Sequence, residues 1–125
     1  MNITNSEWKI MKLLWEEPRT IIQLTKDLEE ETGWKKNTII NMLKRLEEKE
    51  AVVHTEGGKA KVFYPNCSKE EVISEESEAF LHKAFEGNVS LFLNAFVRKD
   101  RLSEQDVDEI CRLLDLERKE EKETR

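Results

Sequence analysis

Apolar residues recur at helical spacing in two segments near the start of the chain. The first segment opens with Thr4 three residues before a glutamate, the spacing of a capping box, and predicts a helix over residues 5–16. The second opens with Thr20 three residues before a glutamine and ends near Gly33. The apolar stripes are Trp8, Met11 and Trp15 in the first segment and Ile21, Leu24 and Leu28 in the second.

The next segment, residues 35–49, also has helical periodicity, and its two faces differ in character. Its apolar face consists of Ile39, Met42, Leu43 and Leu46, and its opposite face consists of Lys36, Asn37, Ile40, Asn41, Lys44 and Arg45. Two β-prone runs follow, residues 51–55 and 60–64, and the Gly57–Gly58 pair between them predicts a tight hairpin. Three helices followed by a hairpin predict an N-terminal winged helix-turn-helix.

The second half of the chain returns to helical periodicity over residues 69–119 and is rich in apolar positions. Three short helices have too little mass to bury so much apolar surface, so we expect them to pack against the same helices of a second copy. The alternative is packing against the winged helix of the same chain. The charged tail, residues 117–125, is expected to fray. The expected dimerisation residues are Val72, Ile73, Phe80, Leu81, Phe85, Phe92, Phe96, Ile110, Leu113 and Leu114.

The expected fold class is therefore mostly α with a small β-hairpin. We expect residues 1–68 to form a winged-helix DNA-binding domain and residues 69–125 a C-terminal helical dimerisation domain. No segment approaches the roughly 20 apolar residues that span a bilayer, so membrane insertion is not expected. The amphipathic start does not have the pattern of a signal peptide, and a cytoplasmic location is the corresponding expectation.

The distribution of charge alters what the net charge suggests. The 125 residues carry a formal net charge of −6, which by itself argues against nucleic-acid binding. All of that excess lies after residue 70, because residues 1–70 contain 12 basic and 12 acidic side chains. Residues 34–45 contain four basic side chains and no acidic one. Contact with phosphate requires a local basic surface of this kind and not a basic protein.

The polar face of the third helix has the residue types that contact DNA. Amide and hydroxyl groups pair with base edges, basic groups pair with guanine or phosphate, and a small apolar group meets a thymine methyl. Ile40 is apolar on this otherwise polar face, which solvation alone does not explain. A solvated face without a partner is the alternative interpretation. Asn37, Thr38 and Asn41 are the expected base contacts, and the expected phosphate contacts are Lys35, Lys36, Lys44, Arg45, Lys59 and Lys61.

Other chemistry has weak support in the sequence. The histidines and cysteines lie far apart without metal-ligand spacing, and neither a phosphate loop nor a nucleophile motif is present, so we expect no cofactor, no metal site and no enzymatic activity. The two cysteines are expected to be reduced. Two alternative functions stay open: a winged-helix protein–protein adaptor without DNA binding, and a regulator that senses a metal or small ligand. The histidines and cysteines weighed as metal ligands are His54, Cys67, His82 and Cys111.

Motifs along nearly the whole chain resemble those of the penicillinase and methicillinase repressor family, the BlaI/MecI type. The resemblance implies a dimeric winged-helix repressor that blocks transcription from double-stranded operator DNA, often of a resistance gene. In such systems a membrane sensor protease pathway ends repression. The matching residues are Ser6–Glu7–Trp8 with Met11 and Trp15, Trp34, Thr38–Ile39, Leu43, Arg45–Leu46, Phe63–Tyr64–Pro65, and Leu102–Ser103 with Ile110.

Three departures from the family pattern are informative. The scissile bond of the family joins Asn to Phe, and the corresponding pair here is Ala95–Phe96, with Asn94 one position earlier. The usual Ser-Pro after the tryptophan is Lys35–Lys36, which makes the start of the third helix more basic and removes a good N-cap. A copper-responsive branch carries C-terminal Cys-x-Cys motifs, whereas this chain has only Cys111 in that region.

Overall fold

The computed structural model of the protein describes residues 1–56 and 58–124. Its first three helices are α1 (Asn5–Glu16), α2 (Ile21–Thr32) and α3 (Lys36–Glu48). Both predicted capping boxes are present, since the side chains of Thr4 and Thr20 each accept a hydrogen bond from the backbone N–H of the third helical residue. Gly33 ends α2 in the left-handed region at φ 68°, a conformation that glycine adopts without a steric penalty.

The sheet has one more strand than the sequence predicted. Strands β1 (Arg19–Thr20), β2 (Val52–His54) and β3 (Val62–Pro65) form an antiparallel sheet in the order β1-β3-β2. In the register of the sheet, Arg19 lies opposite Phe63 and Val53 lies opposite Tyr64. A two-residue strand is too short to show an alternation of apolar and polar residues, so β1 is defined only by its pairing with β3.

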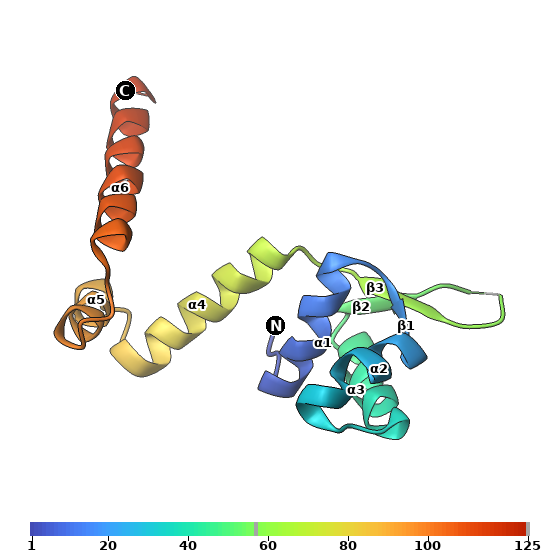
Figure 1. The fold of residues 1–125 in the computed structure, drawn as a ribbon. Helices are drawn as coiled ribbons and strands as arrows, with labels where there is room; N and C mark the ends of the chain where they lie inside the picture. Colours follow the sequence, from blue (N-terminus) through green and yellow to red (C-terminus); the bar gives the residue numbers. More distant parts are fainter. Residues whose placement is uncertain (57, 125) are drawn as a thin grey trace. The chain divides into compact units, whose positions relative to one another are not determined.

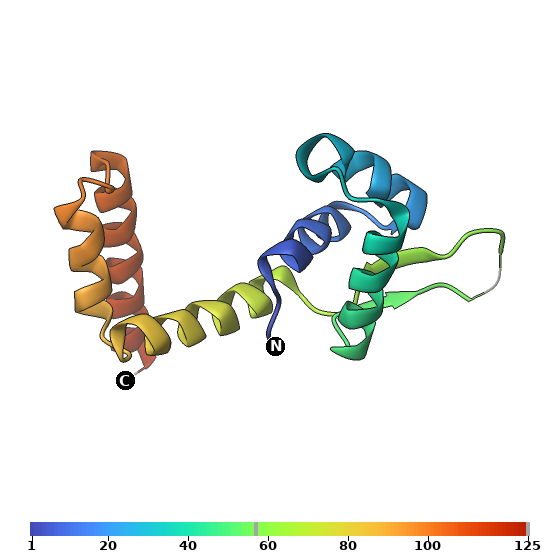
Figure 2. The ribbon, with the colours of Figure 1, turned by 90° about the horizontal axis from the view of Figure 1, so that it is seen from below.

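The hairpin strands are shorter than expected, and the predicted tight turn is wrong in its extent. The strands end at His54 and begin again at Val62, and a bond of 3.0 Å from Thr55 N–H to Val62 O closes the ladder. The described residues beyond that point are exposed, so no packed face extends the pairing. The part of the turn prediction that concerns Gly57 lies outside the described residues. In Figures 1 and 2 the hairpin projects away from α1, α2 and α3.

The chain divides into two compact units, one from Met1 to Ser77 and one from Glu78 onward. The first unit has a continuous apolar core built by α1, α2, α3 and the sheet, with the first turns of α4 (Lys69–Phe85) added. The core residues are Ile3, Ile10, Met11, Leu14, Leu24, Leu28, Ile39, Met42, Leu43, Leu46, Ala51, Val52, Phe63 and Val72. The domain boundary expected at residue 68 stays a prediction, while α4 contributes its first half to this unit.

The second unit contains the end of α4 together with α5 (Val89–Arg98) and α6 (Glu104–Thr124). Helix α6 continues to Thr124, past residue 117 from which fraying was expected; fraying itself stays a prediction, and Arg125 lies outside the described residues. The tail is rich in Glu, Lys and Arg, which are strong helix formers, and this composition accounts for the extension. Within residues 1–56 and 58–124, none of the helices combines the length and apolar character that crossing a membrane requires.

Candidate nucleic-acid interface

Helix α3 is held by one face and presents the other to solvent. The four apolar residues predicted for the inner face, Ile39, Met42, Leu43 and Leu46, are all buried in the core. The side chains expected to contact DNA are all exposed, and Ile40 between them is half-buried. The exposed set on the helix and its N-cap is Lys35, Lys36, Asn37, Thr38, Asn41, Lys44 and Arg45. Sequence periodicity therefore located this face correctly.

The start of α3 suits an anion. Lys35 is the N-cap residue, and its side chain makes no capping hydrogen bond. The first backbone N–H groups of a helix have no partners within the helix and carry partial positive charge, which favours a phosphate. The first turn of α3 contains no acidic residue. Lys35 and Lys36 therefore add their charge to a helix end that already attracts a negative group.

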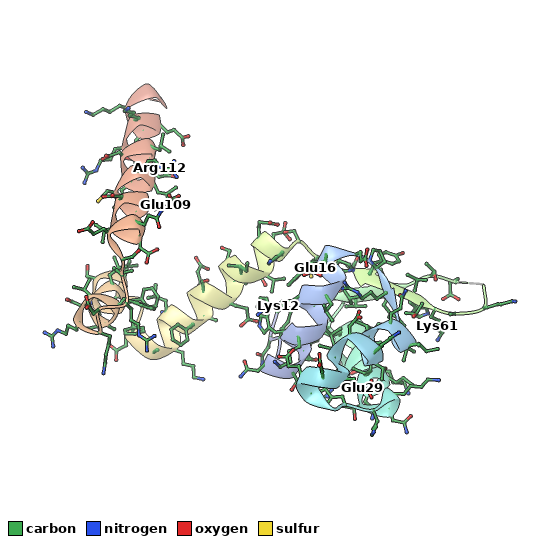
Figure 3. The ribbon with its side chains drawn as sticks, viewed as in Figure 1. Lys12, Glu16, Glu29, Lys61, Glu109 and Arg112 are labelled. Carbon is green, nitrogen blue, oxygen red and sulfur yellow. The ribbon has the colours of Figure 1, made fainter. Side chains whose placement is uncertain are left out.

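Two open hollows flank this helix start. The first, of about 230 Å³, brings the wing lysines Lys59 and Lys61 together with Lys36 and the first turn of α2. Figure 3 shows Lys61 at the hairpin side of the first unit. The second hollow, of about 350 Å³, lies between α2 and α3 and includes Ile22, Thr25, Lys26, Glu29, Gly33, Trp34, Lys35 and Lys36.

The structure thus adds residues of α2 to those predicted from the sequence. Ile22 lines both hollows beside the predicted contacts and Lys26 lines the second, although periodicity had singled out only the buried stripe of this helix. A sequence signal did exist for Ile22, since it falls outside the stripe that Leu24 and Leu28 continue. It identifies an apolar residue on the outer face, but tertiary structure is needed to say what lies beside it.

Polar contacts tie α3 to α1 at its C-terminal end and to strand β2 along its side. At its end, Lys49 Nζ lies 2.5 Å from Oε1 of the buried Glu7 in α1. On its side, His54 Nδ1 in β2 lies 2.9 Å from Oε1 of Glu47, and His54 Nε2 lies 3.5 Å from Glu56. The ring of His54 also packs against Phe63 at 5.4 Å between centroids. The exposed face of α3 is therefore held relative to both α1 and the base of the wing.

The electrostatics of Glu7 follow from its surroundings. Burial raises the pKa of Glu7, but hydrogen bonds from Lys49 and from the backbone and side chain of Thr4 outweigh burial, and the net pKa is lowered. The side chain is therefore charged at neutral pH, and Lys49 balances that charge. This pair belongs to the framework behind α3 and not to its exposed face.

The histidines and cysteines do not form a cluster. In the described part of the chain, no group of three or more His, Cys, Asp or Glu side chains is arranged to hold a metal ion. Both cysteines are free. Burial raises the pKa of the Cys67 thiol, and the carboxylates of Glu71 and Glu75 raise it further. Cys67 is consequently protonated at neutral pH, and its Sγ lies 3.6 Å from the backbone oxygen of Ala51.

The predicted dimerisation residues fall into two groups. Val72 lies instead in the core of the first unit, only 2% exposed, because the first turns of α4 pack there. The others form exposed or half-exposed surface, with Phe80 54% and Leu114 56% exposed. The remaining members are Ile73, Leu81, Phe85, Phe92, Phe96, Ile110 and Leu113.

An aromatic cluster organises the start of the second unit. The rings of Phe80, Phe85, Phe92 and Phe96 meet edge to face, with centroids 4.9 Å apart for the pair Phe92 and Phe96. Together with Ala95 they line an apolar hollow of about 200 Å³. On α6, the guanidinium of Arg112 donates a hydrogen bond of 2.5 Å to Oε1 of Glu109; both residues are labelled in Figure 3. Both residues of the candidate cleavage pair, Ala95 and Phe96, lie within helix α5.

Comparisons with known proteins agree with this geometry. The model of the penicillinase repressor family matches residues 3–116. The penicillinase repressor of Bacillus licheniformis is 28% identical over 122 residues, which cover 97% of this chain and 95% of that protein. The methicillin resistance regulatory protein MecI of Staphylococcus aureus (strain N315) is 21% identical over 113 residues, covering 90% of this chain and 92% of that protein.

A solved structure of the same kind matches the first unit. The monomeric form of Bacillus licheniformis BlaI, in complex with the blaP half-operator, aligns with a TM-score of 0.50 and 29% identity, covering 57% of this chain and 88% of that chain. The predicted winged helix-turn-helix is thereby confirmed. The chain belongs to the penicillinase repressor family of winged-helix DNA-binding regulators, which are not enzymes.

Proposed function

We propose that this chain represses transcription by binding a palindromic operator as a homodimer, and that it controls a resistance operon. The observation that carries the proposal is the exposed face that residues 35–45 present without an acidic side chain, beside the wing lysines. Asn37, Thr38 and Asn41 have the groups that pair with base edges in the major groove. The phosphate contacts would be made by Lys35, Lys36, Lys44, Arg45, Lys59 and Lys61.

The proposed dimer rests on the apolar surface of the second unit. Helices α5 and α6 leave large side chains open to solvent, including Phe96, Leu113 and Leu114. Exposed apolar surface of this extent favours a partner with the same surface. BlaI has been solved as a monomer on a half-operator, so one winged helix of that repressor fits one half-site. A two-fold dimer would supply two such units about one helical turn apart, roughly 34 Å.

The proposed end of repression is proteolysis through a membrane sensor protease pathway, as the family resemblance implies. The candidate bond is Ala95–Phe96, and Phe96 is part of the aromatic cluster. Cutting there would separate Phe96 from Phe92 and disrupt the apolar surface proposed for the dimer. A peptide bond within a helix enters a protease site only after the helix unwinds locally, so cleavage requires local opening of α5.

A repressor of transcription acts in the compartment that contains the DNA, and we propose a cytoplasmic location for this chain.

Selection from random duplexes tests the proposed function. The full chain is incubated with a random duplex pool at moderate and high salt, and the retained sequences are determined. We expect a two-fold symmetric consensus whose retention falls as salt rises, because phosphate contacts release counterions. Retention of no duplex would contradict the proposal and favour a protein–protein adaptor. Parallel selections with divalent metal ions and with chelator test the regulator that senses a metal.

A further inference from the structure

Ile22 is the most exposed large apolar side chain in the described part of the molecule, with 68% of its surface open to solvent. It lies in the first turn of α2, whose inner face buries Leu24 and Leu28 in the core. A single exposed apolar residue is ordinary and has no meaning by itself. What distinguishes Ile22 is the set of side chains around it.

Ile22 lines both hollows that flank the start of α3. In the hollow on the wing side it lies with Lys36, Lys59 and Lys61. In the hollow on the other side it lies with Lys26, Lys35 and Lys36, together with one acidic residue, Glu29. An apolar group bordered by five lysines fits a partner that combines negative charges with a small apolar group.

Duplex DNA is such a partner, because thymine carries a methyl group in the major groove between two rows of phosphates. In a helix-turn-helix the N-terminal residues of the recognition helix contact base edges, while the preceding helix crosses the backbone. Ile22 lines the same two hollows as Lys36, the first residue of α3, so it lies at the base-contacting end of the motif. A lysine or asparagine at this position would favour phosphate, whereas isoleucine cannot form a hydrogen bond.

We propose that Ile22 is a specificity-determining residue that contacts the C5 methyl of a thymine in each operator half-site. This inference rests on the proposed function, because it requires the face around α3 to bind duplex DNA. It adds an apolar contact from α2 to the polar base contacts of α3. The operator would then have a thymine at one position of each half-site, and replacing that base would weaken binding through the loss of a methyl group.

The test removes the methyl group from each partner in turn. The duplex selected by the full chain is prepared with each thymine replaced singly by deoxyuridine, which lacks only the methyl. Dissociation constants are measured for the wild type and for Ile22→Ala. We expect one replacement in each half-site to weaken wild-type binding about four-fold, the effect of one buried methyl-sized group. The same replacement should leave binding by Ile22→Ala unchanged, because the contact is already absent.

Two further variants control for other effects. Ile22→Val keeps a branched methyl pair and should retain most of the sensitivity to deoxyuridine. Lys26→Ala changes the same hollow but removes a charge. It should weaken binding to all duplexes evenly, while binding stays sensitive to the deoxyuridine replacement. Because Ile22 is exposed, thermal unfolding of Ile22→Ala should match that of the wild type.

Two outcomes would overturn the proposal. In one, wild type and Ile22→Ala respond equally to every deoxyuridine. In the other, Ile22→Ala weakens all sequences evenly, which would assign Ile22 to the sugar–phosphate backbone. Either result leaves the proposed function intact so long as the wild type still selects a palindromic duplex. Failure to select any duplex would contradict the proposed function itself, so the two failures can be told apart.

Discussion

Lys49 Nζ lies 2.5 Å from Oε1 of Glu7, and this ion pair joins the first turn of α1 to the C-cap residue of α3. Glu7 is fully buried, while Lys49 is 30% exposed and reaches the carboxylate from the surface. The same Oε1 accepts a bond of 2.9 Å from the backbone N–H of Thr4. Oε2 of Glu7 is buried without a hydrogen-bond partner among the described residues, so Lys49 is the principal compensation for the charge.

Replacing Lys49 by Met should therefore destabilise the first unit. The buried carboxylate would lose its counter-charge, and breaking one side of a buried pair costs about 3 kcal/mol. The free energy of unfolding, measured by urea denaturation at pH 7, checks this. Lys12→Met is the matched control, because Lys12 is an exposed lysine on α1, the helix that contains Glu7 (Figure 3), and its replacement should have little effect. A stability equal to that of the wild type would contradict the role assigned to Lys49.

The lowered pKa of Glu7 predicts how stability depends on pH. A carboxyl group whose pKa is lower in the folded state binds fewer protons there than in the unfolded chain, so folding is favoured at higher pH. This contribution is fully present above the ordinary glutamate pKa and is lost as the pH falls through the lower folded value. Urea denaturation of the wild type and of Glu7→Gln over a series of acidic pH values checks the prediction. The stability difference should shrink as the pH falls, and a constant difference would contradict it.

Replacing Arg45 by Ala should weaken DNA binding through the loss of a phosphate contact. Arg45 is exposed on the outer face of α3, so its removal leaves the core intact. Each lost phosphate contact lowers the slope of log affinity against log salt by about one, counted once per protomer on the duplex. Fluorescence anisotropy across a salt series measures this slope. Lys12→Ala provides the control, since it removes the same charge from α1. An unchanged slope for Arg45→Ala would remove Arg45 from the interface.

Replacing Leu114 by Asp should dissociate the proposed dimer. Leu114 is exposed on α6, and a second copy that covers it would have to bury the new carboxylate without a partner. Sedimentation equilibrium at micromolar concentration should give the monomer mass for this variant and twice that mass for the wild type. Gln105→Asp introduces the same side chain on the opposite side of α6 and should stay dimeric. If Leu114→Asp is a dimer, α6 does not form the interface.

Features that depend on residues close together along the chain could be predicted from the sequence. Capping boxes at Thr4 and Thr20 and the four-residue inner face of α3 are local patterns, because a helix repeats every 3.6 residues. They fixed the helices, the winged-helix order and the exposed face that contains Asn41 and Arg45. The same periodicity located the apolar surface of α5 and α6.

Only the tertiary structure decided which residues meet across long stretches of chain. The pairing of Arg19 with Phe63, the burial of Val72 and the ion pair between Glu7 and Lys49, 42 residues apart, have no local signal. Each depends on how helices and strands pack after they form, and many such arrangements are compatible with one periodic pattern. The position of Ile22 between five lysines is of the same kind. Periodicity shows that a side chain points outward, and packing alone determines what lies next to it.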